Sequence, residues 1–280
     1  MRFFSYKDRP VHLGPYPLER LPRTSTCPDL SVMGAAQALS FDDPGRPQSL
    51  MHAMARFIGM FDVIRDGPVA PQRAEVPDDP AERARHLKAA AYYFDASMAG
   101  VCALTPAMHL DTPLRNPMVA QLARELEASQ PKSFAAGIDM ILADVLDSAR
   151  VEHKPIDNHT HALVILVEYP RDPQDGEPGA EWIIGTQAQR AATLSAQTAV
   201  VLSTYLRMLG FQARSHTATC TDVDLRKLAV AAGLAEIRQS DGSVELVNPY
   251  LGTRFGLAAV TTGFTMEADR PLAPSTASSR

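Results

Sequence analysis

Four side chains of the kinds that bind metal ions stand just before an apolar run: His153, Asp157, His159 and His161. If a strand begins in this segment, His159 and His161 point to the same face, as paired metal-ligating imidazoles often do. The flanking Lys154-Pro155 dipeptide and Thr160 are equally typical of a polar approach to a buried strand. Metal binding is therefore the weaker alternative, and we predict no metal site.

A second pair with chemical potential, His216 and Cys220, lies within the segment Ser-His-Thr-Ala-Thr-Cys. A nucleophile needs an adjacent base and a third group that orients the base, and a serine is often presented on a G-x-S-x-G turn. No third group or turn of this type is found, so we predict a surface loop after a strand and assign no catalytic residue. The next charged residues alternate in sign, which is typical of a solvated helix face: Asp222, Asp224, Arg226 and Lys227.

Glycines and methionines offer two further options. The segment from Gly233 to Gly242 has neither GxGxxG nor GxxxxGK[ST] spacing, and Gly233 ends a predicted helix, so we predict no nucleotide loop. Five methionines suit core packing, with an apolar pocket for a large flat cofactor as the alternative: Met51, Met54, Met60, Met98 and Met108.

The composition limits the class of protein. Of the 280 residues, 45% are hydrophobic and 21% are charged, which is enough apolar surface for a sizeable core in one or two domains. The net charge is −5 without a basic run, so we expect no nucleic-acid partner. Cys27, Cys102 and Cys220 form no CxxC pair, which argues against zinc or iron–sulfur ligation and fits a reducing compartment. Neither an export signal nor an apolar run of about 18 residues occurs, so we expect no membrane span and a cytoplasmic location.

The elements that must position these residues alternate between helices and strands, which predicts an α/β sandwich. Helices are expected at residues 50–64, 117–128, 132–149, 186–209 and 223–232, and another opens at Asp79-Pro80 with a buried stripe of Leu87, Ala91, Phe94 and Met98. Asp222 is expected to cap the helix at 223–232. Strands are expected at residues 98–104, 161–169, 211–214, 244–247 and 255–264. The longest of these helices, at residues 186–209, carries one apolar face: Leu194, Thr198, Val201, Tyr205 and Met208.

The strand at residues 161–169 contains the run Ala-Leu-Val-Ile-Leu-Val, which is apolar on both faces. Continuous apolarity of this kind predicts a central strand that is covered on both sides.

Several segments resemble, in the same order, the corrinoid-binding domain of reductive dehalogenases and, more distantly, epoxyqueuosine reductases. From Leu228, LAVAAGLAEIRQSDG is similar to the family's LAVxAGLGExGR-type turn, and PYLGTR from Pro249 is similar to its Pro-x-x-Gly-x-Arg turn. YLRMLGFQA from Tyr205 and HLKAAAYYFDASMAGVC from His86 resemble two further units of the family. The matches extend over residues 15–272, and the resemblance is to the catabolic, cytoplasmic type of the family.

The resemblance implies a nitroreductase-like α/β sandwich with a mixed sheet and an extended N-terminal arm. The arm covers residues 1–46, a corrinoid-domain-like module covers residues 47–270, and a linker or tail covers residues 271–280. The family binds base-off cobalamin, uses a tyrosine as proton donor, and receives electrons from iron–sulfur clusters in a following segment. By resemblance only, the cofactor-binding residues of this chain are Glu236, Arg238, Asn248 and Pro249.

Two departures concern the chemistry of the family. No tyrosine occurs between Tyr169 and Tyr205, where the proton donor is expected, and Ala192 or Thr193 cannot supply a phenol proton. No cluster cysteines follow the segment Asp269-Arg-Pro.

A third departure concerns the cofactor turn, where Ala235 replaces a glycine and changes the close backbone approach that a corrin ring requires. Together the departures predict a degenerate, non-catalytic first module that does not bind cobalamin. Its partner is then the catalytic half of the same enzyme, whose substrate is a halogenated aromatic such as a halophenol. Two alternatives stay open: a stand-alone corrinoid-binding protein, and a nitroreductase-like flavin enzyme, although the N-terminus lacks a basic phosphate-binding cluster.

Overall fold

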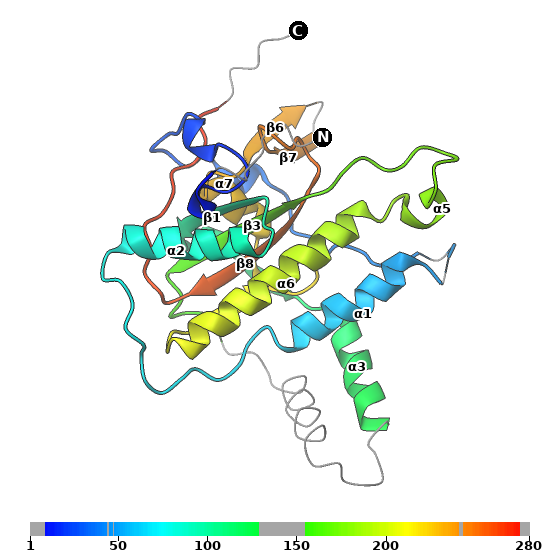
Figure 1. Cartoon of the computed structure of the whole chain (residues 1–280), viewed down its shortest axis with the longest axis horizontal. Coiled ribbons are helices and arrows are strands. Elements are labelled where there is room, and N and C mark those ends of the chain that lie inside the picture. The colour runs from blue at the N-terminus through cyan, green and yellow to red at the C-terminus, as the bar shows by residue number, and fades with distance from the viewer. Residues whose placement is uncertain (1–8, 44, 47, 129–154, 241–242, 275–280) are drawn as a thin grey trace.

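A four-stranded antiparallel sheet forms the centre of the computed structural model, which describes residues 9–43, 45–46, 48–128, 155–240 and 243–274 (Figure 1). Its strands are β1 (Met98–Ala103), β3 (His161–Glu168), β8 (Phe255–Thr262) and β4 (Ala213–His216), in the order β1-β3-β8-β4. The mixed sheet expected from the sequence is wrong for this part of the chain. β3 and β4 run in the same direction, but β8 lies between them and pairs antiparallel with both.

The interior strand β3 pairs with β1 on one side and β8 on the other, which confirms the prediction of a central strand. Its side chains alternate between two cores, as the period of two in a strand requires. Leu163 and Ile165 pack against helices α2 (Pro80–Tyr93) and α6 (Gln187–Met208), whereas Val164 and Leu166 pack against helix α7 (Leu225–Ala231) and the N-terminal arm. Helices α2 and α6 therefore cover one face of the sheet (Figure 1).

Helix α1 (Leu50–Val63) lies against the side of α6 that carries Ala192 and Ala196, and α3 (Pro117–Ala128) packs against α1. The helix expected at residues 132–149 lies outside the described residues. A short helix, α5 (Ala180–Ile183), precedes α6. Helix α2 begins as predicted, because Asp79 accepts a hydrogen bond from the amide of Ala81 and Pro80 occupies the first turn.

Four predictions about side chains in these elements need correction. The cap of α7 is Asp224, which accepts from the amides of Arg226 and Lys227, and not Asp222. Helix α2 ends at Tyr93, so Phe94 and Met98 are not part of its buried stripe.

The third correction concerns α6. The apolar face that was predicted for this helix is mainly exposed. Leu194, Val201, Tyr205 and Met208 are exposed, and Thr198 is buried. The face against the sheet consists instead of small and branched residues, among them Ala191, Ala199 and Leu202. The fourth correction is that Met60 is exposed, whereas Met51, Met98 and Met108 are core residues.

Two smaller sheets complete the fold. Strands β2 (His109–Leu114) and β5 (Thr221–Val223) form one, and the hairpin of β6 (Glu236–Ser240) and β7 (Ser243–Val247) forms the other. Within the described residues, no helix is both long enough and apolar enough to cross a membrane.

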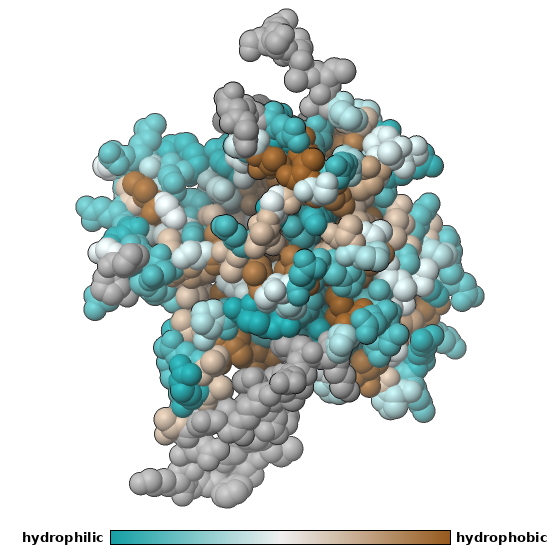
Figure 2. All heavy atoms as spheres, turned by 180° about the vertical axis from the view of Figure 1, so that it is seen from behind, coloured by the Kyte–Doolittle hydropathy of each residue, from teal (hydrophilic) through white to brown (hydrophobic). Residues whose placement is uncertain are grey.

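The N-terminal arm runs along the face of the sheet that α7 covers and contains three short 3-10 turns, at Val11–Leu13, Leu18–Arg20 and Leu30–Val32. The arm also contacts the C-terminal segment, since Arg23 forms an antiparallel bridge with Leu272 and the amide of Thr24 donates to the carbonyl of Pro271. Another 3-10 turn, Pro106–Met108, precedes β2. Seen from behind, hydrophilic residues dominate the periphery of the molecule, and hydrophobic residues show in the middle of the face (Figure 2).

Candidate functional site

The four residues assigned to cofactor binding by resemblance all lie in or directly after the β6–β7 hairpin. Glu236 and Arg238 are on β6, with Glu236 half-buried and Arg238 exposed; Asn248 follows β7 and is buried, and Pro249 is exposed. The fold therefore brings them into one region. None of them lines the cavities described below.

Asn248 uses its amide group within the chain. Its side-chain nitrogen donates to the carbonyl of Leu234 at 2.6 Å and contacts the sulfur of Met98 at 3.0 Å. Its side-chain oxygen accepts from the backbone amides of Tyr250 and Leu251 at 2.8 and 3.0 Å. With donor and acceptor both engaged, Asn248 holds the turn that follows β7 and has little capacity left for a ligand.

The glycine turn that the resemblance assigns to the corrin ring is covered by the chain itself. Gly233 has a φ of +64°, and the guanidinium of Arg23 lies where a side chain at Gly233 would begin. Arg23 donates to the carbonyl of Gly233 at 2.6 Å and to the carbonyl of Arg270 at 3.0 Å. The close approach that a glycine allows is therefore taken by the arm, and the residues present here do not fit a corrin ring.

A cavity of about 580 Å³, which we call the arm cavity, lies between the arm, the N-terminal half of α6 and the 217–226 segment. The arm is fixed over it by hydrogen bonds from the amide of Leu39 to the carbonyl of Ala218, and from Arg226 to the carbonyl of Gly34. The lining residues that ionise are Asp224 and Arg226, and they pair with each other at 2.8 Å. No tyrosine lines the cavity, and α6 presents the methyl group of Ala192 to it.

A larger hollow of about 1110 Å³, which we call the tyrosine hollow, lies at the other side of α6. Four of the seven tyrosines of the chain line it: Tyr16, Tyr93, Tyr169 and Tyr250. Tyr16 hydrogen-bonds to the carboxylate of Glu168, and its ring lies 5.6 Å from the ring of Tyr250 between centroids. The hollow combines aromatic rings with three arginines, Arg171, Arg190 and Arg254.

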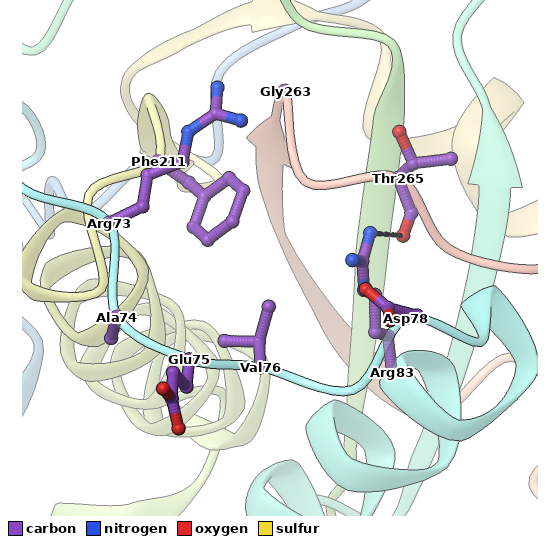
Figure 3. Close-up of a pocket in the computed structure, with 9 residues that line it drawn as sticks. All are labelled: Arg73, Ala74, Glu75, Val76, Asp78, Arg83, Phe211, Gly263 and Thr265. Atoms are coloured by element: carbon purple, nitrogen blue, oxygen red, sulfur yellow. Dashed lines mark hydrogen bonds between the residues drawn. The ribbon is translucent and has the colours of Figure 1, made fainter.

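A third hollow, of about 550 Å³, lies between the 73–78 loop, the start of α2 and the end of β8 (Figure 3). Its arginines serve the fold: Arg73 stacks on Phe211 at 4.9 Å, and Arg83 donates to the carbonyl of Thr265 at 3.5 Å and stacks on Phe264 at 5.0 Å. These arrangements stabilise the loop against the core. Glu75 and Asp78 also line the hollow.

The densest group of ionised side chains is buried beside β4 and β5. Asp222 pairs with Arg65, with Arg214 at 3.1 Å and with Arg115 at 2.9 Å. Burial by itself raises the pKa of a carboxyl, but the guanidinium groups, Arg65 first, outweigh it and hold the pKa of Asp222 well below its usual range. The expectation of a solvated helix face for Asp222 and Asp224 is therefore wrong, since both are buried or nearly so.

Cys220 lies next to this group and is fully buried, so the surface loop expected for His216 and Cys220 is also wrong. The thiol of Cys220 accepts a hydrogen bond from Arg65 at 2.9 Å. Burial nevertheless raises its pKa, and a thiol with a raised pKa is a poor nucleophile. The pair therefore has a structural role.

His216 belongs to a chain of neutral groups. Its Nδ1 accepts from the amide of Asp222 at 3.2 Å, so Nε2 carries the proton and donates to the hydroxyl of Thr261 at 2.7 Å. The same hydroxyl lies 2.7 Å from Nδ1 of His159. Burial, with Arg214 nearby, lowers the pKa of His159 to about 4. Burial, with Arg65 nearby, holds the pKa of His216 well below its usual range, so both rings are neutral at pH 7.

The histidine cluster before β3 is not assembled in the described residues. His159 precedes β3 and bonds to Thr261, while His161 bonds to the hydroxyl of Thr160 at 2.8 Å. His153 lies outside the described residues. Nowhere in the described part of the chain do three His, Cys, Asp or Glu side chains come together as a metal site.

A second buried carboxylate joins three segments. Asp62, on α1, accepts hydrogen bonds from the hydroxyls of Thr217 and Thr219, each at 2.6 Å, and from the amide of Asn116 at 2.8 Å. Burial raises its pKa to about 6, although these hydrogen bonds oppose the shift. Asp62 thus ties α1 to the start of α3 and to the loop between β4 and β5.

Neither a protein-family model nor a curated protein matches the chain. Among solved structures, the catabolic reductive dehalogenase NpRdhA aligns with 98% of this chain at 39% identity and a TM-score of 0.67. NpRdhA in complex with 3-bromo-4-hydroxybenzoic acid aligns with 99% of this chain at 38% identity and a TM-score of 0.68. Epoxyqueuosine reductases also match, at 14% identity and a TM-score of 0.41, which is too distant to place the chain with them.

The alignment covers 32% or 33% of the NpRdhA chain, so this chain spans about a third of the length of that protein. A structure of a reductive dehalogenase that concerns B12-dependent dehalogenation matches to the same extent. These matches confirm the family recognised from the sequence segments. With 39% identity over nearly its whole length, the chain belongs to the reductive dehalogenase family, as a relative of one third of a catabolic reductive dehalogenase.

Proposed function

We propose that this chain is a non-catalytic module of a cobalamin-dependent reductive dehalogenase, which supports the catalytic half of the enzyme. The observation that carries the proposal is the relation of lengths: the chain matches NpRdhA over 98% of its own length but only 32% of that protein. The same proposal includes the domain bounds predicted from the sequence, a nitroreductase-like sandwich and a cytoplasmic location.

The non-catalytic part of the proposal is supported by the groups that replace the expected chemistry. The arm cavity has no phenol beside α6, because Ala192 lines it and the hydroxyl of Thr193 donates to the carbonyl of Gln189 at 2.8 Å. Arg23 covers the turn at Gly233. The arm cavity thus lacks a phenol as proton donor, and the turn at Gly233 is covered, which supports a non-catalytic role for this module.

The substrate of the whole enzyme is proposed to be a halogenated aromatic such as a halophenol. The support is that NpRdhA has been seen in complex with 3-bromo-4-hydroxybenzoic acid, a halogenated phenol that carries a carboxylate. The catalytic half of the same enzyme, with its cobalamin and iron–sulfur clusters, is then the partner of this module.

The test is the absorption spectrum of the purified chain after incubation with hydroxocobalamin or FMN and removal of the free compound. We expect neither compound to be retained. Retention of one cobalamin per chain would contradict the proposal and favour a stand-alone corrinoid-binding protein. A yellow protein would favour a flavin enzyme.

The variant Asn248→Ala makes this test sharper. Because the amide of Asn248 bonds only within the described chain, we expect the variant to lose about 1–3 kcal/mol of stability in urea unfolding and to leave cobalamin retention at the background level. A wild-type chain that retains cobalamin and a variant that does not would instead place Asn248 in a cofactor site.

A further inference from the structure

The exposed face of α6 lacks the charged residues that normally cover a solvent-facing helix. Of the 22 residues in α6, only Arg190 and Arg207 are charged, and Arg207 is buried with hydrogen bonds to the carbonyl of Ala213 and the hydroxyl of Thr204. The exposed positions are occupied instead by large apolar or uncharged side chains: Leu194, Gln197, Val201, Thr204, Tyr205 and Met208. Met208 is 69% exposed and Tyr205 49%. A stripe of this kind is typical of a surface that another body covers.

The stripe continues into the tyrosine hollow. Leu194, Gln197 and Thr198 of α6 line the hollow together with Tyr93 and Phe94 from the end of α2. Tyr93 is 77% exposed, and its ring lies 5.2 Å from that of Phe94 in an edge-to-face arrangement. The helix stripe and the hollow therefore form one surface, which we call the α6 face. Helix α6 itself lies at the front of the fold in Figure 1.

The residue types of the α6 face are those of protein interfaces. Tyrosine, methionine and arginine are enriched at interface cores, where they fill pockets on the partner, and lysine and glutamate are depleted. Arg190 and Arg254 line the hollow beside apolar side chains, and both are exposed; the acidic residues there are Asp95 and Glu168, and Glu168 is bonded to Tyr16. Exposed arginines beside apolar side chains suit a partner whose apolar surface is flanked by carboxylates.

We propose that the α6 face is the surface on which the remaining two thirds of a reductive dehalogenase dock. This rests on the proposed function, and it names the place of contact and the chemistry of the partner. The length of NpRdhA indicates the occupant. The segment of NpRdhA that matches this chain belongs to a protein about three times as long, so the rest of NpRdhA offers a large surface to that segment. Phe57 and Met60 of α1, which packs against α6, and Ile64 directly after α1 are also exposed.

The test is a thiol footprint of the α6 face. Single cysteines are introduced as Val201→Cys and Met208→Cys, with His86→Cys on the charged side of α2 as the matched control, in a Cys27→Ser background because Cys27 is the exposed cysteine. Each variant is labelled with a maleimide as the isolated chain and as a chimera in which this chain replaces its matched segment in NpRdhA. Retention of cobalamin by the chimera reports that the rest of the enzyme is folded.

In the chimera we expect labelling at positions 201 and 208 to slow by at least about tenfold, because access then needs a rare opening of the contact. Labelling at position 86 stays unchanged. Equal rates at positions 201 and 208 in the chimera and in the isolated chain would overturn the proposal. So would protection already in the isolated chain together with a dimeric mass by light scattering, because the occupant would then be a second copy.

A binding experiment provides the second measurement. The isolated chain is mixed with the separately produced part of NpRdhA that has no counterpart here, and complex formation is followed by analytical ultracentrifugation. We expect Val201→Asp combined with Tyr205→Asp to weaken the complex at least about a hundredfold, as for the loss of two anchor residues, whereas Arg85→Ala on α2 leaves it unchanged. The inference is overturned if no complex forms in the mixture and positions 201 and 208 are also unprotected in the chimera. It is equally overturned if the double variant forms the complex as tightly as the unchanged chain. Failure of the proposed function is recognised separately, by retention of cobalamin in the isolated chain.

Discussion

Helices α2 and α6 cover the same face of the central sheet, but their outer sides differ in kind. The outer side of α2 carries Arg85 and His86, both exposed, and its Lys88 pairs with Asp269 at 2.6 Å. The outer side of α6 has a single charged residue, Arg190, and a row of exposed apolar side chains. The two helices bury similar inner faces, so the difference reflects what lies outside them: water over α2, and by our inference another part of the enzyme over α6.

The inner and outer sides of α6 can be separated by neighbouring residues. Leu202 is 1% exposed and belongs to the core against the sheet, whereas Val201 is 37% exposed. We expect Leu202→Ala to lower the free energy of unfolding by about 2–5 kcal/mol and Val201→Ala by less than about 0.5 kcal/mol. Urea unfolding of the isolated chain measures both. Similar losses for the two variants would show that the outer side of α6 is packed in the isolated chain.

Asp62 ties α1 to the start of α3 and to the loop between β4 and β5, and its ionisation gives a pH dependence. Its pKa of about 6 in the folded chain lies above the ordinary value of 3.8, so the folded state binds more protons than the unfolded state between these values. Stability from this group is therefore largest at low pH and falls as the pH rises from about 4 to about 6, by up to about 1.4 kcal/mol per pH unit.

Asp62→Asn removes this dependence, and urea unfolding at several pH values measures it. The control is Asp66→Asn, because Asp66 is half-buried and pairs with Arg214 at 2.5 Å. An unchanged slope between pH 4 and 6 in Asp62→Asn would mean that Asp62 is ionised throughout in the folded chain.

The N-terminus of α2 is fixed locally, whereas that of α6 has no side-chain cap. We expect Asp79→Ala to cost about 0.5–2 kcal/mol, because the amide of Ala81 loses its acceptor, while Asp79→Asn retains most of the stability. Thermal unfolding measures both variants. Equal losses in both would indicate that the charge of Asp79, rather than its cap, stabilises α2.

The smallest change in stability is expected at Met208, where solubility is the property that distinguishes the variants. Met208→Glu places a charge on the outer side of α6, and we expect a change in unfolding free energy within about 0.5 kcal/mol together with higher solubility of the isolated chain. The matched change on α2, Arg85→Leu, should lower solubility. Precipitation by ammonium sulfate compares them, and a lower solubility of Met208→Glu would remove the distinction between the two helices.

The sequence was sufficient where one local signal determines an element. Pro117 opens α3 and the predicted bounds match it, and the apolar run of β3 identified the interior strand. Periodicity failed on α6 because both sides of the helix carry apolar residues, and the buried side mixes Leu202 and Leu206 with small residues such as Ala191 and Ala199. Small residues are needed where the sheet comes very close: a side chain on Gly256 would lie 2.6 Å from the backbone of Ala191.

The site could be predicted only in part, because the ion-pair and hydrogen-bond partners of its residues come from distant segments of the chain. Asp222 and Arg214 look solvated in the sequence, since nothing local indicates that Arg65 and Asp66, far along the chain, neutralise them in the interior. Asp62 was missed for the same reason, because its partners Asn116, Thr217 and Thr219 come from distant segments. The cofactor-binding residues assigned by resemblance do lie together, in or directly after the β6–β7 hairpin. Nothing in the sequence indicates, however, that Arg23 lies over Gly233.

The position of β8 between β3 and β4 has a consequence for the order of folding. A ribosome releases β3, α6 and β4 before β8 exists, so until then the apolar strand β3 lacks its second neighbour and its backbone groups along that edge have no partner. The growing chain therefore cannot close its sheet progressively from the first strand onward. It must accept β8 between two strands that run in the same direction, so the sheet can form in full only after β8 has been synthesised.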